Sequence, residues 1–190
     1  HAAFMGIGAY TSAILTAKFS VNFFVALLAG SLTAIFFGMV LGFPTLRLRG
    51  DYLAIATLGF GEIIRVIILN QKITGGPVGL RGIPGCTNVW IVLTAVVLSY
   101  LVAYRLVNSQ VGRAFIAIRE DELAADSMGI NTVYHKILAF MVGAFFAGLA
   151  GGLYAHYIRY VNPNNFGFLR SIEILSMVVI GGMGTLRGSF

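Results

Sequence analysis

The chain has 190 residues, of which 58% are hydrophobic and 11% are charged, with 13 Lys and Arg against 7 Asp and Glu. Soluble domains usually carry about 25% charged residues, so this composition excludes a soluble globular domain, as well as a disordered tail and a disulfide scaffold. It predicts an integral membrane protein built from helices. We expect a fragment of a longer protein, because the chain begins at His1 inside an apolar run and stops at Phe190 without a polar tail.

Uncharged runs predict the membrane spans, since about 20 apolar residues cross the hydrocarbon core as a helix. In chain order the runs are residues 1–17, 19–46, 88–104, 137–158 and 172–183, of which the first and last are incomplete and the last contains one charged residue, Glu173. The apolar segment 51–69 contains Gly59, Gly61, Glu62 and Arg65, so we expect a membrane helix that is either broken or re-entrant, or faces a cavity. The fold class is therefore all-α: a single transmembrane helical bundle over residues 1–190, with about six membrane segments and no sheet.

Small residues recur at four-residue intervals in two of the runs. Those in the second run are Gly30, Ala34, Gly38 and Gly42. Those in the run 137–158 are Ala144, Gly148 and Gly152, with Gly143, Ala147 and Gly151 beside them. Small residues let membrane helices approach closely, so we expect these faces to pack against other helices.

Two segments are polar. Residues 73–85 contain five glycines and two prolines and are expected to form a loop. Residues 108–136 hold the densest charge cluster, made up of Arg113, Arg119, Glu120, Asp121, Glu122, Asp126 and Lys136. Within this loop, Asn108 or Ser109 caps one short helix over residues 113–128, Gly129 provides a tight turn, and Asn131 or Thr132 caps the next span.

The basic residues give a weak orientation signal. If residues 108–136 are cytoplasmic, seven basic residues lie at that end: Arg47, Arg49, Arg105, Arg113, Arg119, Lys136 and Arg187. Five lie at the other end: Lys18, Lys72, Arg81, Arg159 and Arg170. The excess follows the positive-inside rule, which places Lys and Arg on the cytoplasmic side.

The sequence lacks the motifs of several catalytic and ligand-binding sites. The phosphate-binding loop G-x-x-x-x-G-K-[ST], metal-ligand spacings and nucleophile motifs are absent, so we expect neither catalysis nor a metal or cofactor. The basic residues are scattered among the spans, which does not suit a nucleic-acid partner.

Two groups of residues are candidate sites. Glu122 and Asp126 share a helix face, and Arg119, three residues before Glu122, is expected to offset part of their repulsion. This helix either docks into a partner protein or lies on the bilayer surface. Glu62 and Arg65 are charges in an apolar segment, so we expect Glu62 to be shielded from lipid. The two residues form either a structural ion pair or a polar wall of a translocation path.

Longer stretches of the sequence resemble a known family. They include HAAFMGIGAY at 1–10, PTLRLRGDYLAIATLGFGEIIR at 44–65, TGGPVGLRGIP at 74–84, GRAFIAIREDELAADSMGIN at 112–131 and NPNNFGFLRSIEILSMVVIGGMGTLRGS at 162–189. These segments look like the LivM-type permease subunits of bacterial branched-chain amino acid ABC importers, in the family's order and over essentially the whole chain.

The resemblance implies that residues 108–136 are a cytoplasmic coupling loop within the permease domain. Such loops carry a motif E-A-A-x-x-x-G that docks into the ATPase. Ala124, Ala125 and Gly129 match it, but Leu123 stands at the glutamate position and Glu122 lies one residue earlier. The residues implied to couple to the ATPase are Arg119, Glu122, Ala124, Ala125, Asp126 and Gly129.

The resemblance also implies a function and partners. The chain would be a non-catalytic, multi-pass subunit in the bacterial inner membrane that carries leucine, isoleucine and valine. A second homologous permease subunit, two cytoplasmic ATPase subunits and a periplasmic or lipid-tethered binding protein would complete the importer. The candidate substrate path comprises Gly59, Gly61, Glu62, Arg65, Gly75 and Gly76.

Three alternatives remain open from the sequence. Permeases with these motifs can carry other cargo, such as urea, amides or other amino acids. A secondary transporter or channel would work without an ATPase, and only Glu62 and Arg65 offer intramembrane ionisable groups for it. A purely structural scaffold fits less well with the charged loop and the glycine-containing segment.

Overall fold

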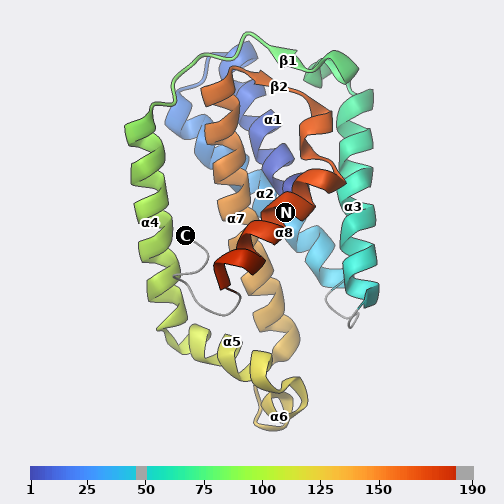
Figure 1. Ribbon diagram of the computed structural model, residues 1–190, viewed down its shortest axis with the longest axis vertical. Helices are drawn as coiled ribbons and strands as arrows, with labels where there is room; N and C mark the ends of the chain where they lie inside the picture. Colours follow the sequence, from blue (N-terminus) through green and yellow to red (C-terminus); the bar gives the residue numbers. More distant parts are fainter. Residues whose placement is uncertain (46–50, 183–190) are drawn as a thin grey trace.

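The computed structural model describes residues 1–45 and 51–182 as a bundle of helices (Figure 1). The helices are α1 (Ala2–Phe19), α2 (Phe23–Thr45), α3 (Asp51–Asn70), α4 (Val89–Val107), α5 (Gln110–Glu120), α6 (Glu122–Ser127), α7 (Thr132–Ile158) and α8 (Phe168–Gly182). Three single turns of 3-10 helix, η1 (Lys72–Thr74), η2 (Gly76–Val78) and η3 (Pro163–Phe166), and two strands, β1 (Leu80–Arg81) and β2 (Tyr160–Val161), complete the chain. Arg47, Arg49 and Arg187, which contributed to the predicted orientation, lie outside the described residues.

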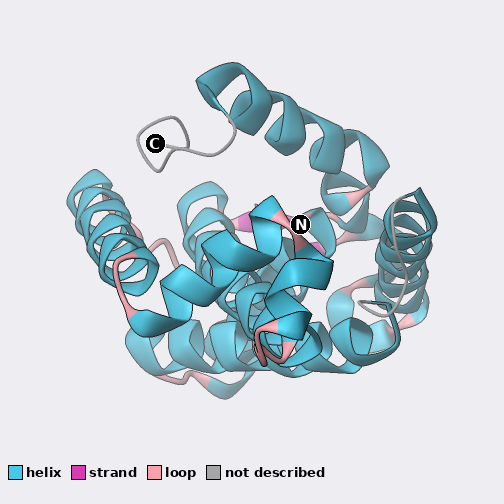
Figure 2. Cartoon of the chain, turned by 90° about the horizontal axis from the view of Figure 1, so that it is seen from below, coloured by secondary structure: helices cyan, strands magenta, loops and turns pink. Residues whose placement is uncertain are grey.

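The all-α fold class is confirmed, and Figure 2 shows that helices make up nearly all of the described chain. Three of these helices are long and apolar enough to cross a membrane, over residues Phe23–Pro44, Val89–Val107 and Thr132–Ile158. The other three predicted segments correspond to α1, α3 and α8. That these three also cross the membrane stays a prediction.

One small sheet contradicts the prediction that the bundle has none. Strands β1 and β2 pair antiparallel, with Leu80 opposite Val161 and Arg81 opposite Tyr160. The two extended segments meet where the chain leaves its helices, and pairing satisfies backbone groups that no helix can satisfy there. We call this end of the bundle the strand end; α5 and α6 lie at the opposite end (Figure 1).

The prediction that segment 51–69 is broken or re-entrant is wrong. It forms the continuous helix α3, which stands at one edge of the bundle (Figure 1). Glycine permits a break but does not impose one, since it costs only about 1 kcal/mol relative to alanine inside a helix. At Gly61 the missing side chain leaves room for a neighbour: a Cβ there would lie 3.7 Å from the Cβ of Ala3.

The core forms where α1, α2 and α7 pack against one another, and the small residues make this close packing possible. The second run packs as predicted: Ala34 is fully buried, and a Cβ on Gly38 would lie 2.9 Å from the Cβ of Ala144. On α7, a Cβ on Gly148 would lie 2.6 Å from that of Ala34, and one on Gly151 would collide with the carbonyl oxygen of Met5. Gly143 is an exception, since a Cβ there would meet open space.

Polar side chains buried between these helices are satisfied within the bundle. The fully buried His156 of α7 contacts the Thr16 hydroxyl of α1 through Nε2 at 2.9 Å and the Gly152 carbonyl oxygen through Nδ1 at 2.7 Å. The Ser31 hydroxyl donates to the Leu27 carbonyl oxygen at 2.9 Å. These bonds remove the cost of burying polar groups in an apolar core.

Helix α4 stands at the opposite edge of the bundle from α3 and has no buried residue. It is separated from α7 by two apolar hollows. One, of about 810 Å³, includes Leu93, Val96 and Leu149 in its lining, and the other, of about 570 Å³, includes Trp90 and Leu98.

Candidate functional site

The predicted coupling loop forms two short helices, not one. Ser109 caps α5, because its hydroxyl oxygen accepts from the Gly112 N–H at 3.3 Å. Asp121 then ends α5 and caps α6, because its carboxylate accepts from the N–H groups of Leu123 at 2.8 Å and Ala124 at 3.0 Å. The prediction of a single helix over residues 113–128 was wrong because this side-chain cap competes with continuation of the helix.

The exit from α6 follows the sequence prediction. Gly129 has a φ of 83°, in the left-handed region that glycine adopts without strain. The N–H of Ile130 donates to the Ala125 carbonyl oxygen at 3.1 Å, as expected for a helix that ends at a glycine. Asn131 caps α7 by accepting from the Tyr134 N–H at 3.0 Å. We refer to α5, α6 and the Gly129 turn together as the coupling element, after the role predicted for them from the sequence.

Ion pairing in the coupling element differs from the prediction. Arg119 does not pair with Glu122; it pairs with its neighbour Glu120 at 2.6 Å. Glu122 instead pairs with Lys136 of α7 at 2.6 Å. Because α6 starts a new helix at Asp121, Arg119 and Glu122 do not share one helix face.

The coupling element rests on α7 on one side and is open on the other. Ala125 is buried, and the ring of Phe115 meets that of His135 edge to face at 6.2 Å. Ala124 and Asp126 are exposed, and the side chains of Leu123 and Met128 remain 65% and 83% exposed. Three of the predicted coupling residues, Glu122, Ala125 and Gly129, therefore hold the element in place, and the other three, Arg119, Ala124 and Asp126, lie on its open surface.

The cap on α6 changes what we expect from a substitution at Asp121. An exposed charge alone would predict a mild effect, but loss of a capping carboxylate usually costs about 1 kcal/mol. We expect Asp121→Ala to destabilise α6 by about that amount, whereas Glu120→Ala, which removes an exposed ion pair, has a smaller effect. Hydrogen exchange at the amides of residues 122–128 measures the difference, and equal exchange in the two variants would contradict the capping role.

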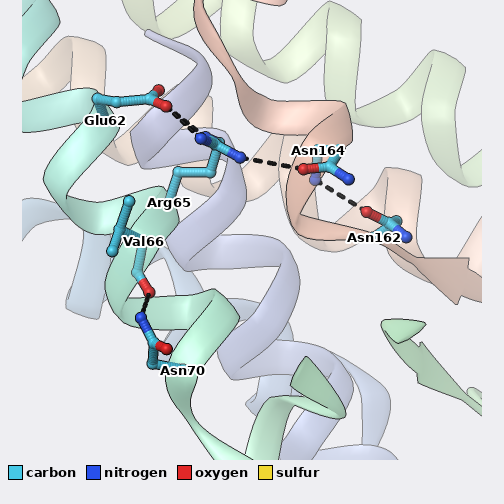
Figure 3. A network of polar contacts seen from close by, with 6 residues as sticks. All are labelled: Glu62, Arg65, Val66, Asn70, Asn162 and Asn164. Atoms are coloured by element: carbon cyan, nitrogen blue, oxygen red, sulfur yellow. Dashed lines mark hydrogen bonds and ion pairs between the residues drawn. The ribbon is translucent and has the colours of Figure 1, made fainter. Parts of the chain in front are cut away.

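The second candidate site, on α3, contains the predicted ion pair. The Arg65 Nε donates to Glu62 Oε1 at 2.7 Å, and Nη2 contacts the same oxygen. Nη1 donates to the Oδ1 of Asn164 in η3 at 3.0 Å, as Figure 3 shows. Asn164 is itself held by its N–H, which donates to Asn162 Oδ1 at 2.9 Å.

Glu62 was also predicted to be shielded from lipid, but the described chain does not bury it. Its side chain is 48% exposed and that of Arg65 is 25% exposed. That Glu62 is shielded from lipid therefore stays a prediction.

The structure separates the residues predicted to line a substrate path. Gly61 and Glu62 line an apolar hollow of about 280 Å³ between α1, α3 and α8, and Arg65 lies one turn further along α3. Gly59 faces open space. Gly75 and Gly76 have φ values of 81° and 57° and make the turns between η1 and η2 at the strand end, beyond the end of α3. Three of the six residues are thus brought together.

Comparison with known proteins identifies the family. The family model of the branched-chain amino acid transport system / permease component matches residues 1–190. The chain belongs to this permease family. No solved structure matches the chain significantly.

The relatives of the permease include different subunits of branched-chain amino acid transport systems and a subunit of an autoinducer 2 import system. The high-affinity branched-chain amino acid transport system permease protein LivM of Salmonella typhimurium is 40% identical over 97% of the chain and 52% of its own length. LivH of the same organism is 34% identical over 53% of the chain and 32% of its own length. The autoinducer 2 import system permease protein LsrC of Salmonella paratyphi B is 31% identical over 71% of the chain and 41% of its own length.

The permease spans about half the length of the LivM proteins that it matches. Family membership, together with its long apolar helices, makes it an integral membrane protein. Among the residues that the structure describes, no cluster of His, Cys, Asp or Glu side chains is placed to hold a metal ion.

Sequence reasoning missed two contributors to these sites. Asn164 was not singled out, although the run Asn-Pro-Asn-Asn at 162–165 is a polar signal between two apolar segments. Lys136 was counted as a charge of the loop but not as the partner of Glu122. Both contacts join separate elements of the permease.

Proposed function

We propose that the chain forms half of the transmembrane pathway of an ATP-driven importer for leucine, isoleucine and valine in the bacterial inner membrane. The main support is the similarity to LivM over 97% of the chain. The coupling element adds support, because it projects from the bundle and is anchored to α7, which packs against α1 and α2 in the core.

The proposal includes the other subunits of the importer. A second, homologous permease subunit would complete the pathway, and the similarity to LivH supports such a pair. Two ATPase subunits would bind the coupling element within loop 108–136 and hydrolyse ATP, so that this single permease domain is not itself catalytic. A periplasmic or lipid-tethered binding protein would deliver the amino acid at the strand end.

In this orientation the coupling element is cytoplasmic. Arg105, Arg113, Arg119 and Lys136 lie at or near that end. At the strand end are Lys18, Lys72, Arg81 and Arg159. Arg170 was expected there too, but it lies in the first turn of α8, which Figure 1 places between the two ends.

Another cargo is the second candidate, since LsrC belongs to an autoinducer 2 import system and is similar over 71% of the chain. A secondary transporter has less support, because the coupling element would then have no partner. Uptake of labelled leucine by cells that express the complete importer distinguishes these possibilities. We expect uptake that needs the ATPase subunits and is not reduced by excess urea or autoinducer 2. Uptake without the ATPase subunits would contradict the proposal.

A further inference from the structure

We infer that Glu62, Arg65 and Asn164 form a contact site for a zwitterionic amino acid, with the carboxylate on Arg65 and the ammonium group on Glu62. The apolar hollow beside them receives the side chain of the amino acid. This inference rests on the proposed function and names the part of the pathway that holds the cargo.

The position of the ion pair is the first argument. Glu62 and Arg65 lie just past the middle of α3, and the Glu62 side chain is half exposed on the surface of the described chain. Charged side chains at membrane depth almost always face a water-filled cavity or another protein surface, because exposure to lipid is expensive. With α3 crossing the membrane as predicted from the sequence, the exposed side of this pair would face a pathway or another protein surface and not the lipid.

The backbone beside the pair supports the same conclusion. Strand β2 lies at the strand end, and η3 then brings Asn164 to Arg65 before α8 begins. Non-helical backbone at membrane depth is tolerated only where protein covers it or where it lines a cavity. Pro163 and Phe166 of η3 are buried, whereas Asn164 is exposed beside Arg65.

The pair also has hydrogen-bonding capacity to spare. A guanidinium group has five N–H donors, and the contacts to Glu62 and Asn164 use three of them. Both Glu62 contacts fall on Oε1, and within the described residues Oε2 accepts no hydrogen bond, as Figure 3 illustrates. Two free N–H donors suit a carboxylate, and a free carboxylate oxygen suits an ammonium group.

The arrangement is held in place before any ligand binds. Asn164 accepts from Arg65 while its own N–H donates to Asn162, so η3 fixes the outer side of the guanidinium group (Figure 3). A site that is ordered in advance loses less entropy when it binds.

The space beside the ion pair suits an amino acid with an apolar side chain. Two hollows, of about 250 and 280 Å³, share Glu62, Gly167 and Phe168 in their linings. The smaller is polar at Arg65 and Asn164, and the larger is lined by apolar side chains that include Phe4, Phe60 and Phe140. The polar contacts would hold the backbone of an amino acid while its branched side chain enters the apolar hollow.

The test measures ligand binding to the purified importer without its binding protein, using labelled leucine. Unlabelled 4-methylpentanoate lacks the ammonium group and 3-methylbutylamine lacks the carboxylate, so each competitor reports on one half of the site. We expect Arg65→Lys, which loses the planar fork, to weaken leucine and 4-methylpentanoate at least tenfold and to leave 3-methylbutylamine unchanged. Glu62→Gln should weaken leucine and 3-methylbutylamine instead.

Arg170 and Glu173 on α8 provide a matched control. They form a pair at the same spacing with a contact of 2.7 Å and exposures of 40% and 55%, and they line neither hollow. Arg170→Lys and Glu173→Gln should leave all three affinities unchanged. If the α3 variants change the three affinities equally, or behave like the α8 variants, the pair is structural and the inference is wrong.

Failure of the site and failure of the proposed function give different results. If the unmodified importer takes up leucine while the α3 variants bind all ligands normally, the site is wrong and the function stands. If the importer moves a different zwitterion and the variants weaken its binding in the same selective way, the cargo is wrong and the site stands. If it binds no zwitterion, both are wrong.

Discussion

Gly129→Val is expected to reduce ATP-driven uptake at least tenfold while the permease still inserts into the membrane. Gly129 has a φ of 83°, where a β-branched side chain is severely strained, by about 1–2 kcal/mol or more. A Cβ at this position meets no atom within 4 Å, so valine would remove no contact. It would change the direction in which the chain leaves α6 and misplace the exposed surface of the coupling element. Co-purification of the ATPase subunits and uptake of labelled leucine measure the effect.

Gly129→Asn is the matched control, because asparagine tolerates the left-handed conformation and is similar in size to valine. We expect the asparagine variant to retain most uptake. If the valine variant retains both its ATPase subunits and its uptake, the coupling role of this turn is wrong.

The paired change Glu122→Lys with Asp126→Lys tests the same element through charge. It replaces the Glu122–Lys136 ion pair by two like charges and reverses an exposed charge on α6. We expect a larger loss of ATPase retention than from a change at Glu120, whose ion pair with Arg119 is mostly exposed. Addition of Lys136→Glu should restore part of the loss, and no restoration would mean that the contact to α7 does not position the element.

Gly151→Val is expected to destabilise the folded permease strongly. A Cβ at Gly151 collides with the carbonyl oxygen of Met5, which belongs to the backbone of α1 and cannot rotate away. Overpacking of this kind costs about 3 kcal/mol, a large part of the stability of a typical domain. The yield of monodisperse protein after detergent extraction, and its melting temperature, measure the loss.

Gly143→Val provides the control on the same helix, since a Cβ there would meet no atom within 4 Å. Both substitutions add the same β-branched side chain to α7, so helix propensity cancels between them. A normal yield of monodisperse protein for Gly143→Val, together with a reduced yield for Gly151→Val, would support the close packing of α1 against α7. Equal yields would contradict the close approach of α1 and α7.

The parts of the fold that follow local rules could be predicted from the sequence. Gly129 was predicted as a helix end, and Ser109 and Asn131 were each one of two candidate caps. All three end a helix in the structure, because caps depend on residues no more than four positions apart. The break at Asp121 obeys the same rules. The sequence analysis nevertheless predicts one helix over this charged stretch, because the stretch is continuous. Asp121 is a residue type that commonly caps a helix, and this was the available signal for the break.

The contacts that build the candidate sites could not be predicted in this way. Asn164 is 99 residues from Arg65, and His156 is 140 residues from Thr16. No periodicity in a single sequence indicates such pairs, because they depend on how the helices pack. Packing also explains why Gly151 is critical and Gly143 is not, although the two glycines belong to the same pattern of small residues.

The central position of α1 has a consequence for synthesis of the protein. Helix α1 ends at Phe19, but α7, whose backbone it contacts at Gly151, begins only at Thr132. At about 5–20 residues per second, a ribosome needs roughly 6–22 s to make the intervening chain. During that interval the hydroxyl of Thr16 has no His156 to contact, and Gly8 of α1, where a Cβ would collide with the backbone of Gly148, has no α7 to cover it. For this period the nascent α1 depends for cover on other surfaces, such as α2, lipid, the insertion machinery or further segments of the protein, and we expect translation speed to influence correct assembly.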